Sequence, residues 1–131
     1  AIEYTLQIAQ GLKVLHKKGL SHRDIKLENV FLQKSNYGYN YIVKLGDFGL
    51  LKNSEDLQSK VGTIFYMAPE MLDLNKQEYN EKVDIWALGC ALHEMLIGEK
   101  LFQGNDINQI RLFQQKTQHF VSNKLYRRLQ K

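Results

Sequence analysis

The sequence contains very little cysteine and proline and no long apolar run. Among its 131 residues there is one cysteine, Cys90, and one proline, Pro69. A single cysteine excludes an internal disulfide and a zinc site built from cysteines, and it favours a reducing compartment. No apolar run reaches the roughly 18 residues that a membrane-spanning helix needs, and the N-terminus lacks the apolar block of a signal peptide. We therefore expect no membrane contact and a cytoplasmic location, with the nucleus as the alternative.

The positive charge of the chain is confined to its C-terminal end. The formal net charge is +4. Residues 114–131 carry five basic residues and no acidic one, so they contribute +5 and the preceding residues contribute −1. This pattern indicates a basic tail rather than a shaped basic patch, and we expect no nucleic-acid partner. The hydrophobic content of 44% is typical of a globular domain with one core.

The first half of the chain predicts a helix followed by a hairpin. Apolar residues recur at steps of three and four, which predicts one buried helical face: Ile2, Leu6, Ala9, Leu12 and Leu15. Gly19 is a typical helix stop. Further on, "NVFLQ" and "YIVKLGDFG" are typical strands, and the turn-rich "SNYGYN" between them predicts a hairpin. Cys90 lies in an apolar stretch, so we interpret it as a small buried side chain.

The second half predicts a loop over residues 50–66 and then two helices. The segment 81–97 is apolar on nearly every side, which indicates a central buried helix. Asn80 is a suitable N-cap for it and Gly98 a suitable stop. A last helix capped by Asn105 or Asp106 is expected to point three apolar residues inward: Ile107, Ile110 and Phe113. The order of elements predicts a mainly α fold with a small β-hairpin, and it lacks the alternation of a parallel sheet.

The stretch "SHRDIKLENV", residues 21–30, is too polar to be an ordinary core segment. It contains one histidine, one arginine, one lysine, two acids and an asparagine. Three further motifs follow in order: "DFG" at 47–49, "GT" with "APE" between 62 and 70, and "DIWALG" from 84. With these motifs, residues 1–113 resemble the C-terminal lobe of the eukaryotic protein kinase catalytic domain. A complete kinase domain has an α+β fold.

The resemblance implies a site for phosphoryl transfer from ATP to a protein hydroxyl. It makes Asp24 the catalytic carboxylate, Lys26 the cation that meets the γ-phosphate, and Asn29 with Asp47 the ligands of Mg²⁺. Phe31 falls where the family has an apolar floor for the adenine ring. The implied cofactors are ATP and Mg²⁺, and the implied partner is a protein substrate with a serine or threonine hydroxyl.

Other positions are implied to regulate or specify the enzyme. Arg23 beside the catalytic carboxylate is typical of kinases whose activation loop is controlled by phosphorylation. Ser59 matches the usual phosphosite and Ser54 is the weaker alternative, so an upstream kinase or autophosphorylation is an expected regulator. Thr63, which in the family hydrogen-bonds the catalytic Asp and Lys, favours Ser/Thr over Tyr specificity, as does Lys26.

Five more residues carry structural roles by resemblance. His22 and Phe48 belong to the packed column that links the lobes, and Gly49 follows Phe48 in the same motif. Glu70 pairs with a buried arginine in the family, and Asp84 braces the catalytic loop. The usual arginine partner of Glu70 has no clear counterpart, because Arg127 and Arg128 arrive too soon along the chain.

The chain departs from the family at three places. Leu27 replaces a usual proline, and the hairpin turn is long for the family; neither removes chemistry. The third departure is larger: there is no Gly-rich loop, no strand lysine in a Val-Ala-Ile-Lys-like context and no helix glutamate to pair with it, so the N-terminal lobe is absent from this chain. Together with the missing initiator Met, this predicts a fragment that transfers no phosphate by itself and is poorly stable.

Three functions remain open at this stage. The first is the Ser/Thr kinase. The second is a catalytically silent kinase-like docking module. The chain keeps every catalytic residue type, and this argues against a silent module. The third is a small-molecule phosphotransferase of the aminoglycoside or choline kinase type, which typically lacks counterparts of Arg23, Thr63 and Pro69. The sequence gives residues 114–131 no clear structure.

Overall fold

The computed structural model describes residues 1–36, 41–47, 63–73 and 79–117. Its elements, in chain order, are α1 (Ile2–Lys17), a 3₁₀ turn (Leu27–Asn29), β1 (Val30–Lys34), β2 (Tyr41–Leu45), a second 3₁₀ turn (Ile64–Tyr66), α2 (Lys82–Ile97) and a helical segment at 107–117. In these ranges no helix is both long and apolar enough to cross a membrane. The mainly α composition with a small hairpin agrees with the sequence prediction.

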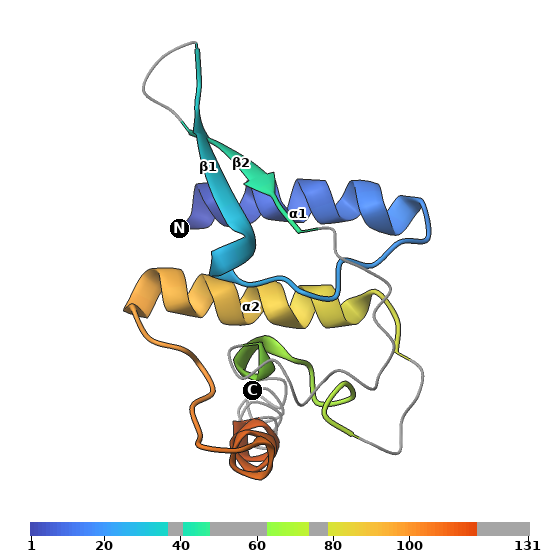
Figure 1. The fold of residues 1–131 in the computed structure, drawn as a ribbon, viewed down its shortest axis with the longest axis vertical. Coiled ribbons are helices and arrows are strands. Elements are labelled where there is room, and N and C mark those ends of the chain that lie inside the picture. The colour runs from blue at the N-terminus through green and yellow to red at the C-terminus, as the bar shows by residue number, and fades with distance from the viewer. Residues whose placement is uncertain (37–40, 48–62, 74–78, 118–131) are drawn as a thin grey trace, which may run out of the picture.

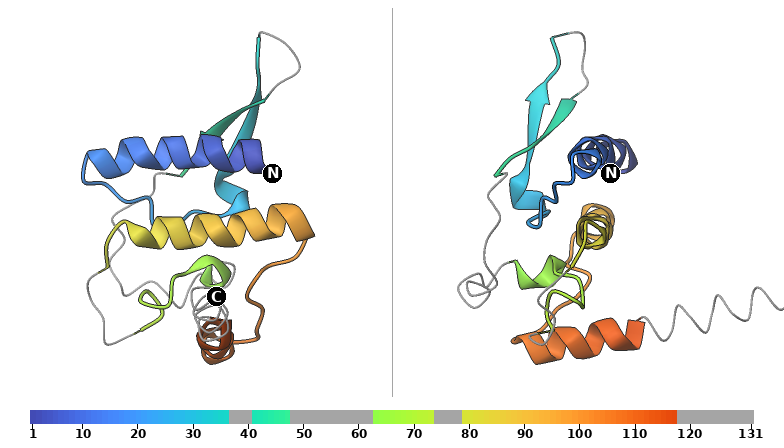
Figure 2. Two further views of the ribbon diagram at one scale, coloured as in Figure 1. Left: turned by 180° about the vertical axis from the view of Figure 1, so that it is seen from behind. Right: turned by 90° about the vertical axis from the view of Figure 1, so that its right-hand side faces the viewer.

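Helix α2 lies at the centre of the molecule. Figure 1 shows α1 and α2 side by side and antiparallel, with the strands β1 and β2 crossing α1 and extending past it. The segments 63–73 and 107–117 lie on the other side of α2, and the views in Figure 2 agree. Helix α2 contacts both α1 and the turn Ile64–Tyr66, while β2 packs against α1. The core therefore forms around α2, between the polar loop and the segment 63–73.

Helix α1 ends as predicted, but its buried face differs from the prediction. The N–H of Leu20 donates to the carbonyl of Leu15 at 3.1 Å, and Gly19 between them has a φ of 70°. Ile8 and Leu12 are fully buried, whereas Ile2 and Leu6 are 70% and 59% exposed. The helix carries two overlapping apolar stripes, and only the stripe through Ile8 and Leu12 faces the core. The inward placement of Ile2 and Leu6 is therefore wrong.

The predicted cap residues lie at the helix ends, although the N-cap position of α2 is Glu81, one residue after the predicted Asn80. The Asn80 side-chain oxygen accepts the backbone N–H of Lys82 at 3.0 Å, and Gly98 ends α2 with a left-handed φ of 83°. Asp106 accepts the N–H of Gln109 at 2.9 Å, and the Gln109 side chain accepts the N–H of residue 105 at 3.0 Å. This reciprocal pair resembles a capping box and starts the helical segment 107–117.

Helix α2 is central, as predicted. It is not buried on every side, however, although the sequence had suggested that it would be. Its buried side chains include a carboxylate: Val83, Asp84, Ala87, Leu88, Cys90 and Ala91. Ile85, Leu96 and Ile97 are 49–63% exposed. Helix α1 and the turn at 64–66 cover only part of its circumference among the described residues, and this leaves the remaining apolar side chains at the surface. Cys90 is buried as predicted, and burial raises the pKa of its thiol to about 12, which favours the protonated thiol over the reactive thiolate.

The helical segment 107–117 buries a glutamine where an aromatic residue was expected. Ile110 and Gln114 are fully buried, and the Gln114 side-chain amide donates to the carbonyl of Met67 at 2.9 Å. Phe113 is 51% exposed, so its predicted inward orientation is wrong. Positions 110 and 114 are one helical turn apart and face the chain segment at Met67, while Phe113 lies a further 100° around the helix. The turn Ile64–Tyr66 also replaces the end of the predicted loop 50–66.

Candidate active site

Asp84 anchors the polar loop to the start of α2. Its Oδ2 accepts the backbone N–H of His22 at 2.9 Å and its Oδ1 accepts the backbone N–H of Arg23 at 2.7 Å. Arg23 has a φ of 63°, a left-handed conformation that few non-glycine residues adopt. Asp84 is 1% exposed, so these are charge-assisted hydrogen bonds in a buried environment. They hold the turn that presents Asp24, as expected for a residue that braces the loop.

His16 provides a third hydrogen bond to the same carboxylate. Its Nε2 lies 2.8 Å from Oδ2 of Asp84, and the contact joins the last turn of α1 to the first turn of α2. The sequence reasoning missed this residue. A histidine at the C-terminal end of a helix is commonly explained by the helix dipole, and nothing local indicates a partner 68 residues away. Three donors thus compensate the burial of the Asp84 charge.

Asp24 is the centre of a compact hydrogen-bonded group. Lys26 Nζ donates to Oδ2 of Asp24 and to Oγ1 of Thr63, both at 3.1 Å. The side-chain amide of Asn29 donates to the carbonyl of Asp24 at 2.8 Å and to its Oδ2 at 3.1 Å. Asp24 and Asn29 are buried at 9% and 8% exposure, whereas Lys26 is intermediate. Four residues that the resemblance singled out are therefore linked by hydrogen bonds through Asp24 and Lys26.

The hairpin returns the chain from Asn29 to Asp47. Val30 pairs with Leu45 at the base of the antiparallel strands, and the N–H of Gly46 donates to the Asn29 carbonyl at 2.9 Å. His22 Nε2 lies 3.1 Å from the Gly46 carbonyl, which ties the same point to the polar loop. Asp47 follows directly, with a φ of 48° and an exposed side chain. The backbone thus places Asp47 beside the loop, as predicted from the hairpin.

Asn29 and Asp47 have donor atoms that suit a hard divalent cation. Both Asn29 hydrogen bonds to Asp24 use the amide nitrogen, so they leave its amide oxygen available. The Asp47 carboxylate is exposed. Mg²⁺ prefers such oxygen ligands and keeps several waters, so it needs few protein ligands. The described residues contain no group of three or more His, Cys, Asp or Glu side chains that could hold a metal, and Mg²⁺ at a pair of oxygen ligands requires no such group.

Phe31 is packed against the glycine that precedes Asp47. A Cβ at Gly46 would lie 2.2 Å from Cε2 of the Phe31 ring, which is closer than any real contact. The Phe31 ring can therefore occupy this position only because residue 46 is a glycine and has no side chain. The ring nevertheless remains 56% exposed, so it offers an aromatic surface next to the base of the hairpin.

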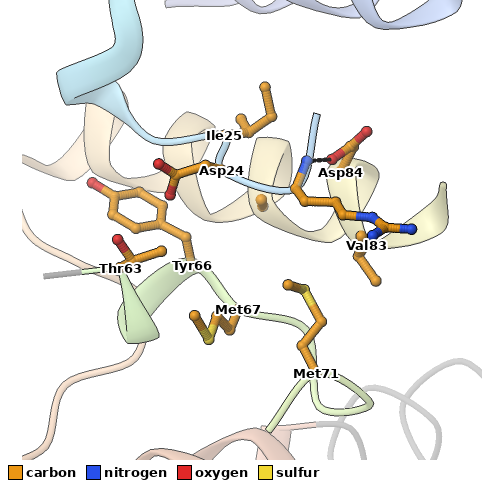
Figure 3. A pocket seen from close by; sticks show the side chains of 10 residues that line it. Asp24, Ile25, Thr63, Tyr66, Met67, Met71, Val83 and Asp84 are labelled. Atoms are coloured by element: carbon orange, nitrogen blue, oxygen red, sulfur yellow. Dashed lines mark hydrogen bonds between the residues drawn. The ribbon is translucent and has the colours of Figure 1, made fainter. Parts of the chain in front are cut away.

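A pocket lies between the polar loop, the segment 63–73 and α2. Figure 3 shows Asp24, Thr63 and Tyr66 gathered at one side of it, with Met67 and Met71 below them. Its wall on the α2 side includes Val83 and Ala87. Asp24 and Thr63 thus lie at the polar end of a pocket with mixed polar and apolar walls.

The remaining predicted residues are only partly accounted for. The Arg23 guanidinium lies over the Tyr79 ring, 5.2 Å from its centroid, so it has a cation–π partner. Ser59, Phe48 and Gly49 lie outside the described residues, and their roles stay predictions. Glu70 is half-buried and makes no ion pair or hydrogen bond with the residues that the structure describes.

Comparison with known proteins identifies the group to which this arrangement belongs. The family model for the protein kinase domain matches residues 1–130. The serine/threonine-protein kinase Nek4 of Mus musculus is 41% identical over 113 residues, 83% of this chain and 13% of that protein. The serine/threonine-protein kinase BCK1/SLK1/SSP31 of Saccharomyces cerevisiae is 45% identical over 101 residues, 73% of this chain and 6% of that protein.

A human relative gives the same result at similar coverage. The serine/threonine-protein kinase Nek5 of Homo sapiens is 41% identical over 109 residues, 80% of this chain and 14% of that protein. The chain thus spans 6–14% of the length of these three relatives. Because the family model covers nearly all of the 131 residues, the chain belongs to the protein kinase domain family.

Proposed function

We propose that the chain is the C-terminal lobe of a protein serine/threonine kinase that transfers the γ-phosphoryl group of ATP to a Ser or Thr hydroxyl. The observation that carries this proposal is the contact group of Asp24, Lys26, Asn29 and Thr63. A catalytically silent module has no need to retain a buried carboxylate with both a cation and an amide on the same oxygen. We place the kinase in the cytoplasm, with the nucleus as the alternative.

Each member of the group has a distinct chemical role in the proposed reaction. The Asp24 carboxylate accepts or orients the proton of the attacking hydroxyl. Lys26, fixed by Asp24 and Thr63 on either side, supplies positive charge for the phosphoryl oxygens as negative charge develops on them. Asn29 holds Asp24 in place through its amide nitrogen. The group is thus ordered before substrate arrives, which lowers the cost of orientation.

We propose that Asn29 and Asp47 hold Mg²⁺, the expected cofactor. When bound, the ion neutralises charge on the phosphate oxygens of ATP. The exposed ring of Phe31 supports an adenine-binding role for this surface, because an aromatic face suits a flat base. We propose Ser/Thr specificity because in the family a threonine at this place hydrogen-bonds the catalytic lysine. Thr63 makes this hydrogen bond with Lys26.

We further propose that the 131 residues transfer no phosphate at a useful rate alone. The sequence contains no Gly-rich loop and no strand lysine in a Val-Ala-Ile-Lys-like context, the two parts that cover and position the ATP phosphates in protein kinases. We therefore assign the kinase activity to the full-length protein that contains residues 1–131, which we call the parent protein.

The acceptor class of the parent protein tests this proposal. Purified parent protein is incubated with γ-labelled ATP, Mg²⁺ and three peptides that differ only in carrying a single Ser, Thr or Tyr; kanamycin and choline serve as small-molecule acceptors. We expect label on the Ser and Thr peptides only. Label on kanamycin or choline would make the parent protein a small-molecule phosphotransferase, and no label on any acceptor would favour the silent docking module.

Phosphorylation of Ser59 is proposed to activate the enzyme through Arg23. A phosphate adds about −1.5 to −2 charges and pairs strongly with a guanidinium. Arg23 now lies over Tyr79, a contact that a doubly charged phosphate can outcompete. We expect Ser59→Ala to abolish most of the activation that an upstream kinase produces in the parent protein, with Ser54→Ala as the matched control. Equal activation of the Ser59→Ala protein and its parent would refute the assignment.

A further inference from the structure

A second group of charged and aromatic side chains lies outside the catalytic contacts. The ammonium of Lys100, in the loop after α2, lies 4.7 Å from the centroid of the Phe65 ring and 5.4 Å from that of Tyr66. Its Nζ is also 3.9 Å from Oε1 of Glu28. Two aromatic faces and a carboxylate thus surround one cation. We call Glu28, Phe65, Tyr66 and Glu94 the cation cage.

The hydroxyl of Tyr66 joins the two carboxylates of the cage. It donates to Glu94 Oε2 and lies 3.5 Å from Glu28 Oε2. Burial, reinforced by the hydrogen bond to Glu94 and by the charge of Glu28, raises the pKa of Tyr66, so its hydroxyl stays protonated and remains a donor. The two carboxylates carry a formal charge of −2, and Lys100 reduces the total to −1. The cage therefore already holds a cation, which is a residue of the same chain.

The cage borders the proposed catalytic group. Glu28 stands between Lys26 and Asn29 in the polar loop, both of which contact Asp24. Tyr66 lines the same pocket as Asp24 and Thr63, as Figure 3 shows. A protein segment that brings a hydroxyl to Asp24 therefore passes close to the cage, and its neighbouring side chains come within reach of the two carboxylates.

The structure points to Lys100 as a specificity-determining residue. Its ammonium group occupies the cation cage, so the cage does not bind basic side chains of a substrate. The excluded ligand is an arginine or lysine side chain near the target hydroxyl. This inference rests on the proposed function for its substrate, while the cage and its closure rest on the contacts alone.

The chemistry of the cage supports this assignment. Carboxylates and aromatic faces are the partners that bind guanidinium and ammonium groups, and the cation–π part strengthens as water is excluded. The side chains of Lys100 and Glu28 are 29% and 56% exposed, so the cage is reachable from solvent. An arginine added from outside would compete directly with Lys100. Removing Lys100 would leave the same partners with their full negative charge and no cation.

Peptide binding to the parent protein tests the role of Lys100 without requiring phosphate transfer. The probes are fluorescein-labelled serine peptides in which one arginine is moved through the positions around the serine, each paired with the same peptide carrying alanine. Fluorescence anisotropy gives the Kd of each peptide for the parent protein and for Lys100→Met. The arginine preference is the Kd of the alanine peptide divided by the Kd of its arginine partner. Methionine keeps an unbranched apolar stem over Phe65 and Tyr66 while it removes the charge.

We expect the largest arginine preference in the series to rise at least about tenfold in Lys100→Met, corresponding to 1.4 kcal/mol. The control, Lys82→Met, changes a lysine at the other end of α2 that pairs with Glu81 at the same 3.9 Å distance, and it should leave the preference unchanged. Lys100→Arg should also preserve it. An arginine preference that is equal in the parent protein and in Lys100→Met, or absent from both, would overturn the inference. Because no transfer is measured, failure of the acceptor assay leaves this result decisive for the cage.

Discussion

Replacing Asp24 by asparagine is expected to reduce the kcat of the parent protein by about 10²- to 10⁴-fold, the usual contribution of a positioned acid or base. Asparagine has nearly the same shape as aspartate, so it keeps an oxygen for Lys26 and for the amide of Asn29. It cannot accept the proton of the attacking hydroxyl. The loss should therefore appear in kcat rather than in the KM for ATP, and initial rates of label transfer to the serine peptide measure both.

The matched control is Glu99→Gln, which makes the same chemical change at an exposed position after α2. It should leave kcat within about twofold of the parent value. Circular dichroism of each variant establishes that the fold is retained. If Asp24→Asn kept a tenth or more of the parental kcat while Glu99→Gln was silent, Asp24 would not be the catalytic carboxylate.

Replacing Asp84 by alanine is expected to lower the free energy of unfolding of residues 1–131 by about 3–5 kcal/mol, the usual cost of breaking a buried ionic contact. The change removes the acceptor of two backbone N–H groups, at His22 and Arg23, and the partner of His16. Each buried donor left without a partner costs about 1–3 kcal/mol. Urea unfolding, followed by the fluorescence of Trp86 and by circular dichroism, measures the change.

Glu81→Ala serves as the control for Asp84→Ala. Glu81 is also a carboxylate at the start of α2, but its side chain is 43% exposed and its lysine partner is 3.9 Å away. Its removal should change the unfolding free energy by less than about 1 kcal/mol. An Asp84→Ala protein that is fully unfolded without urea agrees with the expectation, provided that Glu81→Ala folds. A loss below 1 kcal/mol in Asp84→Ala would show that the polar loop is held by other contacts.

The sequence predicted the proposed site better than it predicted the burial of the helices. Asp24, Lys26 and Asn29 lie within six residues, so local spacing alone brings them together. The hairpin placed Asp47 because β1 and β2 are consecutive along the chain and pair antiparallel, which returns the chain to Asn29. The contact of Lys26 with Thr63 spans 37 residues, and only the resemblance to kinases indicated it. Local pattern and resemblance thus account for the contact group.

The features that the sequence did not predict arise from packing between distant elements. His16 contacts Asp84 across α1 and α2, and periodicity carries no information about such a pair. Lys100 belongs to a loop, and its place among the rings of Phe65 and Tyr66 depends on where α2 ends. The wrong inward placement of Phe113 has the same origin, because the hydrogen bond from Gln114 to the backbone at residue 67 decides which face of the helix is buried.

We propose that the polar loop at residues 21–30 is a phosphoryl-transfer site. The most direct test is the amount of labelled phosphate that the parent protein moves from ATP to a serine peptide, in Mg²⁺ and again in EDTA. We predict transfer in Mg²⁺, none in EDTA, and none above background in Mg²⁺ with Asp24→Asn. No transfer by the folded parent protein, or transfer at the same rate by Asp24→Asn, would contradict it.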